Sequence, residues 1–168
     1  SERFQHWWGD KIPADLEQET VDAITVRREK LLKEPTVYAT SVGASQVGFH
    51  FDLNIYDDIV DNKTVLTDGA MAKTKQWYEE SLALHEKNSR LIFIGTRWHD
   101  ADLAGELLHN ASYKHMVRSA IEHGAPIFPE KFDTKRLARL KAQMSCRSFS
   151  CQYLNDPVFI ELTPEKMT

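Results

Sequence analysis

Two short apolar segments constrain the fold of this chain more than any other feature of its sequence. Residues 51–56 (FDLNIY) run into the acidic pair Asp57-Asp58, and residues 90–95 (RLIFIG) are apolar almost throughout and bounded by turn residues. The second run has the form expected of a central strand buried on both faces of a parallel sheet, and the first is expected to be a buried strand that ends in carboxylates. Between them, residues 67–87 have helical spacing of apolar side chains. Strand, helix and strand in this order predict an α/β fold with a parallel sheet and right-handed crossovers.

The rest of the chain supplies shorter elements. Residues 1–22 predict a short leading element and a loop, and residues 23–27 and 36–42 predict two strands joined by a polar loop. Asp100 is the expected N-cap of a helix that continues to about residue 108, and residues 113–118 predict a further strand. Asp133 is expected to cap another helix, and residues 149–153 predict a second short one.

Composition limits the class of protein. A chain of 168 residues allows one domain, and 42% hydrophobic with 27% charged residues is typical of a soluble globular protein and excludes intrinsic disorder. No stretch reaches the roughly 18 apolar residues of a membrane helix, and the first residues have no signal-peptide pattern, so we expect a cytoplasmic protein. Because the formal net charge is -4, any contact with nucleic acid has to come from a local basic patch.

The acidic pair at the end of residues 51–56 is the strongest local feature. An apolar strand that ends in two carboxylates can hold a hydrated Mg²⁺ with Asp57 and orient or deprotonate a water with Asp58, as in nucleotide hydrolases. The alternative is that the pair caps the following loop or helix. In parallel sheets ligands collect at the carboxyl ends of the strands, which favours a functional role.

The second strand run ends in Gly95, Thr96 and Arg97. A hydroxyl and a guanidinium at this place can sense a γ-phosphate or pass on a signal of hydrolysis. The alternative is a tight turn in which Gly95 eases the exit from the strand, Thr96 satisfies backbone groups and Trp98 packs into the core.

Basic residues crowd the region near the C-terminus, where they are expected on one helix. They form either a solvated helix face or a contact for the phosphate backbone of nucleic acid. The seven histidines form no ligand array with recognisable spacing. The basic residues are Lys131, Lys135, Arg136, Arg139, Lys141 and Arg147, and the nucleic-acid contact is assigned to Lys135, Arg136 and Arg139.

With these residues in view, the chain resembles the ATPase part of a phage DNA-packaging terminase large subunit. Each matching segment is short, but the set lies in the family's order and spans residues 33–157. The segments are Lys33-Glu34-Pro35-Thr36, Gly43 and Gly48 ahead of residues 51–58, Ile94 to His99 with Asp102-Leu103, residues 128–132 (FPEKF), and residues 149–157 (FSCQYLNDP).

This resemblance implies a P-loop-type ATPase core with additional strands, which drives double-stranded DNA into a procapsid. It implies ATP and Mg²⁺ as cofactors, and as partners duplex DNA, a portal ring, a small terminase subunit and further copies of the chain, in the cytoplasm of the host cell. Asp57 would match the Mg²⁺ carboxylate, Asp58 the catalytic carboxylate that is usually Glu, and Gly95, Thr96 and Arg97 the coupling motif.

The sequence departs from the family in two ways. It has no G-x-x-x-x-G-K-[ST] loop to cradle phosphates, and it ends where a nuclease domain would begin. We therefore expect an incomplete core, with residues 1–157 as the C-terminal portion of the ATPase domain and residues 158–168 as a tail or linker. The chain is then either a piece of a longer terminase or a degenerate relative, and by itself it is expected not to hydrolyse ATP.

Two other functions fit the sequence. One is a non-catalytic DNA-binding or assembly module that keeps the α/β scaffold and uses the basic helix. It also fits a small unrelated α/β hydrolase with Asp57-Asp58 as its metal site, although no G-x-S-x-G elbow supports acyl transfer.

Overall fold

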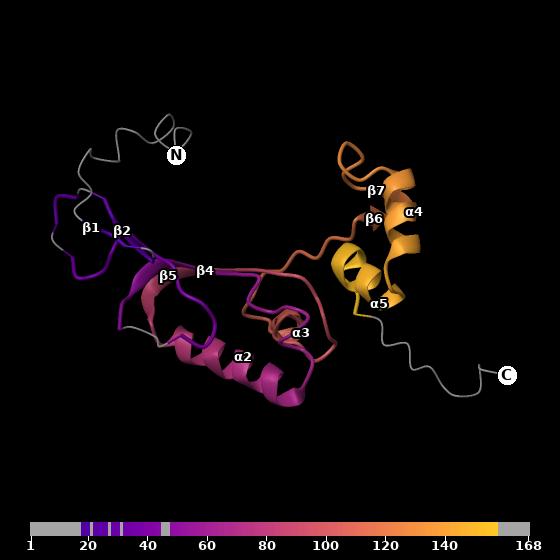
Figure 1. The fold of residues 1–168 in the computed structure, drawn as a ribbon. Helices are drawn as coiled ribbons and strands as arrows, with labels where there is room; N and C mark the ends of the chain where they lie inside the picture. Colours follow the sequence, from indigo (N-terminus) through magenta and orange to yellow (C-terminus); the bar gives the residue numbers. More distant parts are fainter. Residues whose placement is uncertain (1–17, 21, 27, 31, 45–47, 158–168) are drawn as a thin grey trace. The chain divides into compact units, whose positions relative to one another are not determined.

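The computed structural model describes residues 18–20, 22–26, 28–30, 32–44 and 48–157. Most of the expected leading element and the expected tail at 158–168 lie outside these residues. Figure 1 shows the elements in chain order, which are β1 (Gln18–Glu19), β2 (Ala23–Thr25), β3 (Val37–Tyr38), β4 (Phe51–Asp57), α2 (Asp68–Leu82), β5 (His85–Ile94), α3 (Leu103–His109), β6 (Ile121–Glu122), β7 (Ala125–Pro126), α4 (Thr134–Gln143), α5 (Cys146–Phe149) and the π-helical turn η1 (Ser150–Leu154).

The chain divides into two compact units. The first comprises Ser1–Asn54 with Trp77–Ile92, and the second comprises Ile55–Gln76 with Phe93–Thr168. The strands β4 and β5 and the helix α2 each contribute residues to both.

A small antiparallel sheet forms the start of the first unit. β2 lies between β1 and β3, with Ala23 opposite Tyr38 and Ile24 opposite Val37. This confirms the two strands expected in this region, although both are shorter than the sequence predicts. The ladder ends early because the Val26 amide donates to the Thr36 hydroxyl at 3.1 Å, a side-chain bond that replaces the next backbone pair.

An aromatic cluster packs beside this sheet. The Tyr38 ring stacks on Phe51 with centroids 6.3 Å apart, and Phe49 meets each of them edge-on. Edge-on and offset contacts are the favoured arrangements of aromatic rings. The cluster ties β3 to the beginning of β4.

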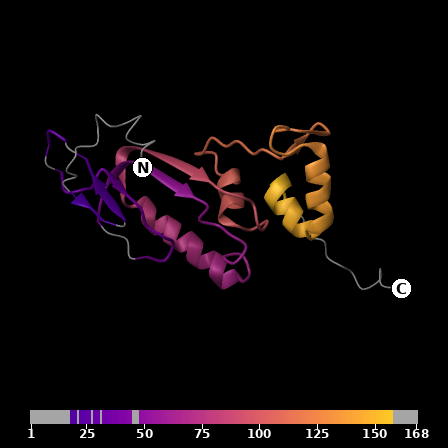
Figure 2. The same ribbon diagram turned by 45° about the horizontal axis from the view of Figure 1, so that its top comes forward.

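β4 and β5 form the parallel pair that the sequence predicts. Figure 2 shows the two arrows side by side and pointing the same way. The expectation that both strands are buried, the second of them on both faces, is wrong, because alternate apolar side chains remain exposed, namely Leu53 (42%), Ile55 (57%), Ile92 (43%) and Ile94 (53%). Within the described residues the parallel sheet has two strands, and no larger P-loop core is shown.

The helix between these strands, α2, begins and ends at identifiable signals. The Thr67 hydroxyl accepts from the Ala70 amide at 3.1 Å, as an N-cap does. Thr74, Tyr78 and Ser81 form its buried face. The helix stops at Leu82, five residues before the predicted end, and His85 already belongs to β5.

The second unit contains a hairpin where the sequence predicts a strand. Residues 113–118 have no regular structure, and Met116 is 81% exposed. The strands β6 and β7 follow instead, joined at His123 (φ 52°) and Gly124 (φ 79°). Two consecutive positive φ angles are those of a tight hairpin turn, which Gly makes accessible. The segment before the turn therefore stays outside any ladder.

The helices α4, α5 and η1 pack around Leu137 and Phe149, which are both buried. Asp133 caps α4 as predicted, since its carboxylate accepts from the Arg136 amide at 2.7 Å. The second predicted helix is present as α5 followed by η1. Among the described residues, no helix combines the length and apolar character needed to cross a bilayer.

Candidate functional site

The ends of β4 and β5 meet within the second unit. The Asp58 amide donates to the Ile94 carbonyl oxygen at 2.9 Å, and Ile94 is the last residue of β5. Asp57 is the last residue of β4, so the acidic pair and Gly95-Thr96-Arg97 follow adjacent strands at the same edge. The sequence predicts this arrangement, and the structure confirms it for the backbone.

The Asp57 and Asp58 side chains are both exposed at this edge. Mg²⁺ is commonly held by one or two carboxylates together with waters and substrate phosphates, so an accessible carboxylate at a strand end fits this ion. Across the residues that the structure describes, no group of three or more His, Cys, Asp or Glu residues is arranged to hold a metal by itself. The donor set therefore fits a Mg²⁺ that arrives with a phosphate ligand.

Asp58 has an unusual backbone conformation. Its φ is 54°, in the left-handed region that Asp and Asn tolerate better than other residues with a side chain. The chain consequently turns sharply as it leaves β4. The extended strand ends at Asp57, so the two carboxylates leave the backbone from different conformations and can take separate roles.

On the neighbouring strand end, the Arg97 guanidinium folds back onto its own loop. Its Nε donates to Asp102 Oδ1 at 3.1 Å, and its Nη2 donates to the His99 and Asp100 carbonyl oxygens at 3.3 and 3.2 Å. The side chain is 16% exposed. These contacts hold the 97–105 loop together. Thr96, directly before Arg97, is half-buried.

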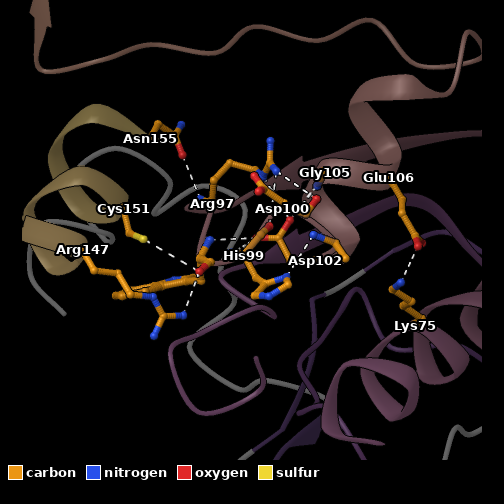
Figure 3. A network of polar contacts seen from close by, with 12 residues as sticks. Lys75, Arg97, His99, Asp100, Asp102, Gly105, Glu106, Arg147, Cys151 and Asn155 are labelled. Carbon is orange, nitrogen blue, oxygen red and sulfur yellow. Dashed lines mark hydrogen bonds and ion pairs between the residues drawn. The ribbon is translucent and has the colours of Figure 1, made fainter. Parts of the chain in front are cut away.

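Asp102 organises this loop. Its carboxylate is fully buried and accepts four hydrogen bonds, as Figure 3 shows in part. In addition to Arg97, the donors are the backbone amides of Trp98 (2.8 Å), His99 (3.0 Å) and Gly105 (2.7 Å). The bond to Gly105 makes Asp102 the N-cap of α3. The expectation that Asp100 caps this helix is therefore wrong.

Gly105 allows the loop to close over the start of α3. A Cβ at this position would lie 2.6 Å from the Asp100 carbonyl oxygen and 2.7 Å from Arg97 Nη2. Both distances are far below normal contact, so only glycine fits here. Sequence reasoning missed the pair Asp102 and Gly105, for which the available signal was an Asp three residues before a Gly at the start of an apolar helix.

The same loop is bound to the C-terminal turn of the second unit. The Asn155 side-chain oxygen accepts from the Arg97 amide at 2.8 Å, and Asn155 itself has a left-handed φ of 57°. The Trp98 carbonyl oxygen accepts from Arg147 Nη2 at 3.3 Å and lies 3.8 Å from Cys151 Sγ. Burial raises the pKa of the Cys151 thiol, which favours the protonated form that donates this contact.

The predicted basic residues do not share one helix. Lys131 precedes α4 and Arg147 lies on α5, which corrects the sequence prediction. Lys135, Arg136 and Arg139 lie on α4 and are exposed. A separate ion pair joins Lys75 of α2 to Glu106 of α3 (Figure 3).

No known family model matches this chain, and a search of curated proteins finds no match. The resemblance to terminase large subunits therefore rests on the ordered motifs alone.

Proposed function

We propose that this chain is a segment of the ATP-driven motor that packages double-stranded viral DNA into a procapsid. The observation that supports the proposal is the hydrogen bond from the Asp58 amide to the Ile94 carbonyl. It joins the strand end with the acidic pair to the strand end with Gly95, Thr96 and Arg97, which is where nucleotide ligands bind in parallel sheets.

In this proposal the two carboxylates divide the work. Asp57 would hold a Mg²⁺, and this ion would neutralise charge on the phosphates of ATP. Asp58 accepts a hydrogen bond from the attacking water and orients it for in-line attack. This sequence has no G-x-x-x-x-G-K-[ST] loop to bind the phosphates of ATP. ATP hydrolysis is therefore proposed for a natural protein that contains both this sequence and a phosphate-binding loop.

The coupling role falls on Gly95, Thr96 and Arg97 together with the loop that follows them. Because the Arg97 guanidinium is bonded to Asp102 and to two carbonyl oxygens, it supports the loop and does not act as an arginine finger. A displacement of Thr96 would move the Arg97 amide and, through Asn155, the turn after η1. This path would connect the strand ends to η1 and α5.

A second candidate function is a non-catalytic DNA-binding or assembly module. The observation that favours it is the set of exposed cations on α4, combined with the lack of a phosphate-binding loop in the sequence. Under this proposal Asp57 and Asp58 only shape the turn after β4.

The test compares two charge-equivalent variants in the natural protein that contains this sequence. Asp57→Asn is expected to abolish Mg²⁺-dependent phosphate release from ATP, because a neutral amide is a poor ligand for Mg²⁺. Asp52→Asn removes the same charge from an exposed position at the other end of β4 and is expected to leave the rate unchanged. Hydrolysis that survives in Asp57→Asn would overturn the motor assignment.

Two further measurements test the motor proposal. Thr96→Ala is expected to spare nucleotide binding and to impair DNA translocation. The 168-residue chain alone is expected to release no phosphate from ATP, since it has no cradle. A natural protein without any ATPase activity whose DNA binding depends on α4 would favour the second candidate.

A further inference from the structure

The start of α4 and the loop before it enclose a surface pocket of about 530 Å³. Four cations line it, Lys131, Lys135, Arg136 and Arg139, against the two carboxylates of Glu130 and Asp133. The pocket is therefore positive in a chain whose formal net charge is -4. A local field of the opposite sign to the whole molecule is typical of a binding surface for anions.

Asp133 reduces this field but does not reverse it, because four cations face two carboxylates in the lining. Its carboxylate is engaged with the first turn of α4, where it accepts from the Arg136 amide at 2.7 Å. The positive end of the helix dipole lies at the same place and compensates the carboxylate further. Glu130 is then the one acidic side chain in the lining without a capping role.

Arg136 is held in place before any ligand arrives. Its Nη1 donates to the Lys131 carbonyl oxygen at 3.0 Å, and its guanidinium lies over the Phe132 ring, 4.8 Å from the centroid. The Phe132 ring is fixed in turn by an edge-on contact with Tyr153 at 5.7 Å. A side chain that is already ordered loses less entropy on binding. Arg136 thus offers its remaining N–H groups to an anion at low cost.

The spacing of the other cations favours a chain of phosphates over a single one. Lys135 and Arg139 are four residues apart on α4, one turn of helix or about 6 Å along its axis. Neighbouring phosphates of one DNA strand follow at about 3.4 Å per step along the duplex axis. Two cations about 6 Å apart can therefore contact phosphates one or two steps apart.

The aromatic ring beside the pocket, Phe132, does not line it and is not available for stacking on bases. The face of Phe132 carries Arg136, the Lys131 ammonium lies 5.5 Å from the ring centroid, and its neighbour Tyr153 meets it edge-on. Contacts here would then be made to phosphates, which carry no sequence information.

From these observations we propose that the pocket formed by residues 129–139 binds the phosphodiester backbone of nucleic acid, with Arg136 as the ordered anchor and Lys135 and Arg139 as a second point of contact. The proposal rests on the second candidate function and names its ligand and its residues. It does not require ATP hydrolysis at the strand ends.

The test measures binding of the 168-residue chain to fluorescent duplexes of about 20 base pairs by anisotropy, over a range of salt concentrations. Lys135→Ala with Arg139→Ala is expected to weaken binding about tenfold or more at about 0.1 M salt and to reduce the salt slope by about 2, one for each lost phosphate contact. Two duplexes of unrelated sequence should bind equally. Arg136→Lys should weaken binding although it keeps the charge, because it loses the guanidinium fork.

The matched control is Lys63→Ala with Lys87→Ala, which removes two exposed charges outside α4 and should change affinity less than about twofold. An equal loss in this control would mean that net charge alone drives binding and would overturn the proposal. Displacement of the duplex by inorganic phosphate at matched ionic strength would indicate a single-anion site. Equal binding of polyglutamate would indicate an acidic protein partner. Either result would overturn the proposal. The binding assay contains no ATP, so this test and the ATPase test fail independently.

Discussion

The Asp58 amide donates a hydrogen bond to the Ile94 carbonyl oxygen across the ends of two parallel strands, at 2.9 Å. Asp58 reaches this bond in a left-handed conformation, with φ 54°, directly after the extended strand that ends at Asp57. Two adjacent aspartates therefore have opposite backbone requirements, and equal substitutions at the two positions should have different effects.

Asp58→Val is expected to lower the free energy of unfolding by about 1–2 kcal/mol, because a β-branched residue is strained at positive φ. Urea denaturation followed by circular dichroism measures this change. Asp57→Val is the matched control and should be neutral or stabilising, since valine favours extended strands. Equal losses at both positions would show that the conformation of Asp58 does not matter.

Gly105→Ala should destabilise the second unit by about 1–3 kcal/mol, because the new methyl group would overlap the Asp100 carbonyl oxygen and the Arg97 guanidinium. Thermal unfolding of the variant checks this. Gly69→Ala is the control within a helix, since its Cβ would meet nothing within 4 Å. That substitution should stabilise the chain by about 0.5–1 kcal/mol through helix propensity. A neutral Gly105→Ala would contradict the close packing of the loop.

The parallel pair was predictable because its information is local. The apolar runs at residues 51–56 and 90–95 are long enough to exclude most alternatives, and a helical spacing lies between them. The cap of α4 was predictable for the same reason, since Asp133 stands directly before the apolar spacing of the helix. The two runs did not predict that Ile55 and Ile94 are exposed, because the burial of these side chains depends on which elements cover the sheet.

The loop after β5 was less predictable. Asp100 and Asp102 are equally good capping residues by type, and only the approach of the Arg97 guanidinium and three backbone amides selects Asp102. Residues 113–118 resemble a strand by composition, yet strand formation needs a partner edge, and the ladder forms between β6 and β7 instead. Tertiary contacts decided both outcomes.

Acid should weaken the turn between β4 and α2. Asp61 accepts from the Thr64 amide at 2.7 Å and from the Lys63 amide at 2.9 Å, and these bonds, with Thr64 foremost, lower the pKa of its carboxyl. A lowered pKa in the folded state means that the carboxylate stabilises the fold above its ordinary pKa and that this contribution is lost as pH falls through the folded value. Stability measured from pH 7 downwards should therefore decline in this acid range.

Asp61→Asn is expected to flatten that part of the pH profile, because the amide does not titrate. Asp52→Asn makes the same change at an exposed aspartate of β4 and serves as the control. Chemical denaturation at a series of pH values measures both. An unchanged profile in Asp61→Asn would assign the acid dependence to other carboxylates.

Asp102→Asn is expected to be the most damaging single substitution in the 97–105 loop. The buried carboxylate accepts hydrogen bonds from three backbone amides and from Arg97. In the asparagine variant the side-chain NH₂ group would face at least one of these N–H donors, with which it cannot form a hydrogen bond. Removing one partner of a buried ion pair costs about 3–5 kcal/mol. Urea denaturation should show a loss in this range, at its lower end because the Arg97 side chain is partly exposed.

Arg97→Gln should cost less than Asp102→Asn, about 1–2 kcal/mol, because the carboxylate keeps its three backbone donors when the guanidinium is lost. Asp100→Asn alters an exposed carboxyl next to the network and should change stability by less than about 0.5 kcal/mol. The double variant of Arg97 and Asp102 should lose less than the sum of the single losses, since both remove the same ion pair. Strict additivity in this cycle would mean that the two side chains do not interact, and the loop would then be held by its backbone bonds alone.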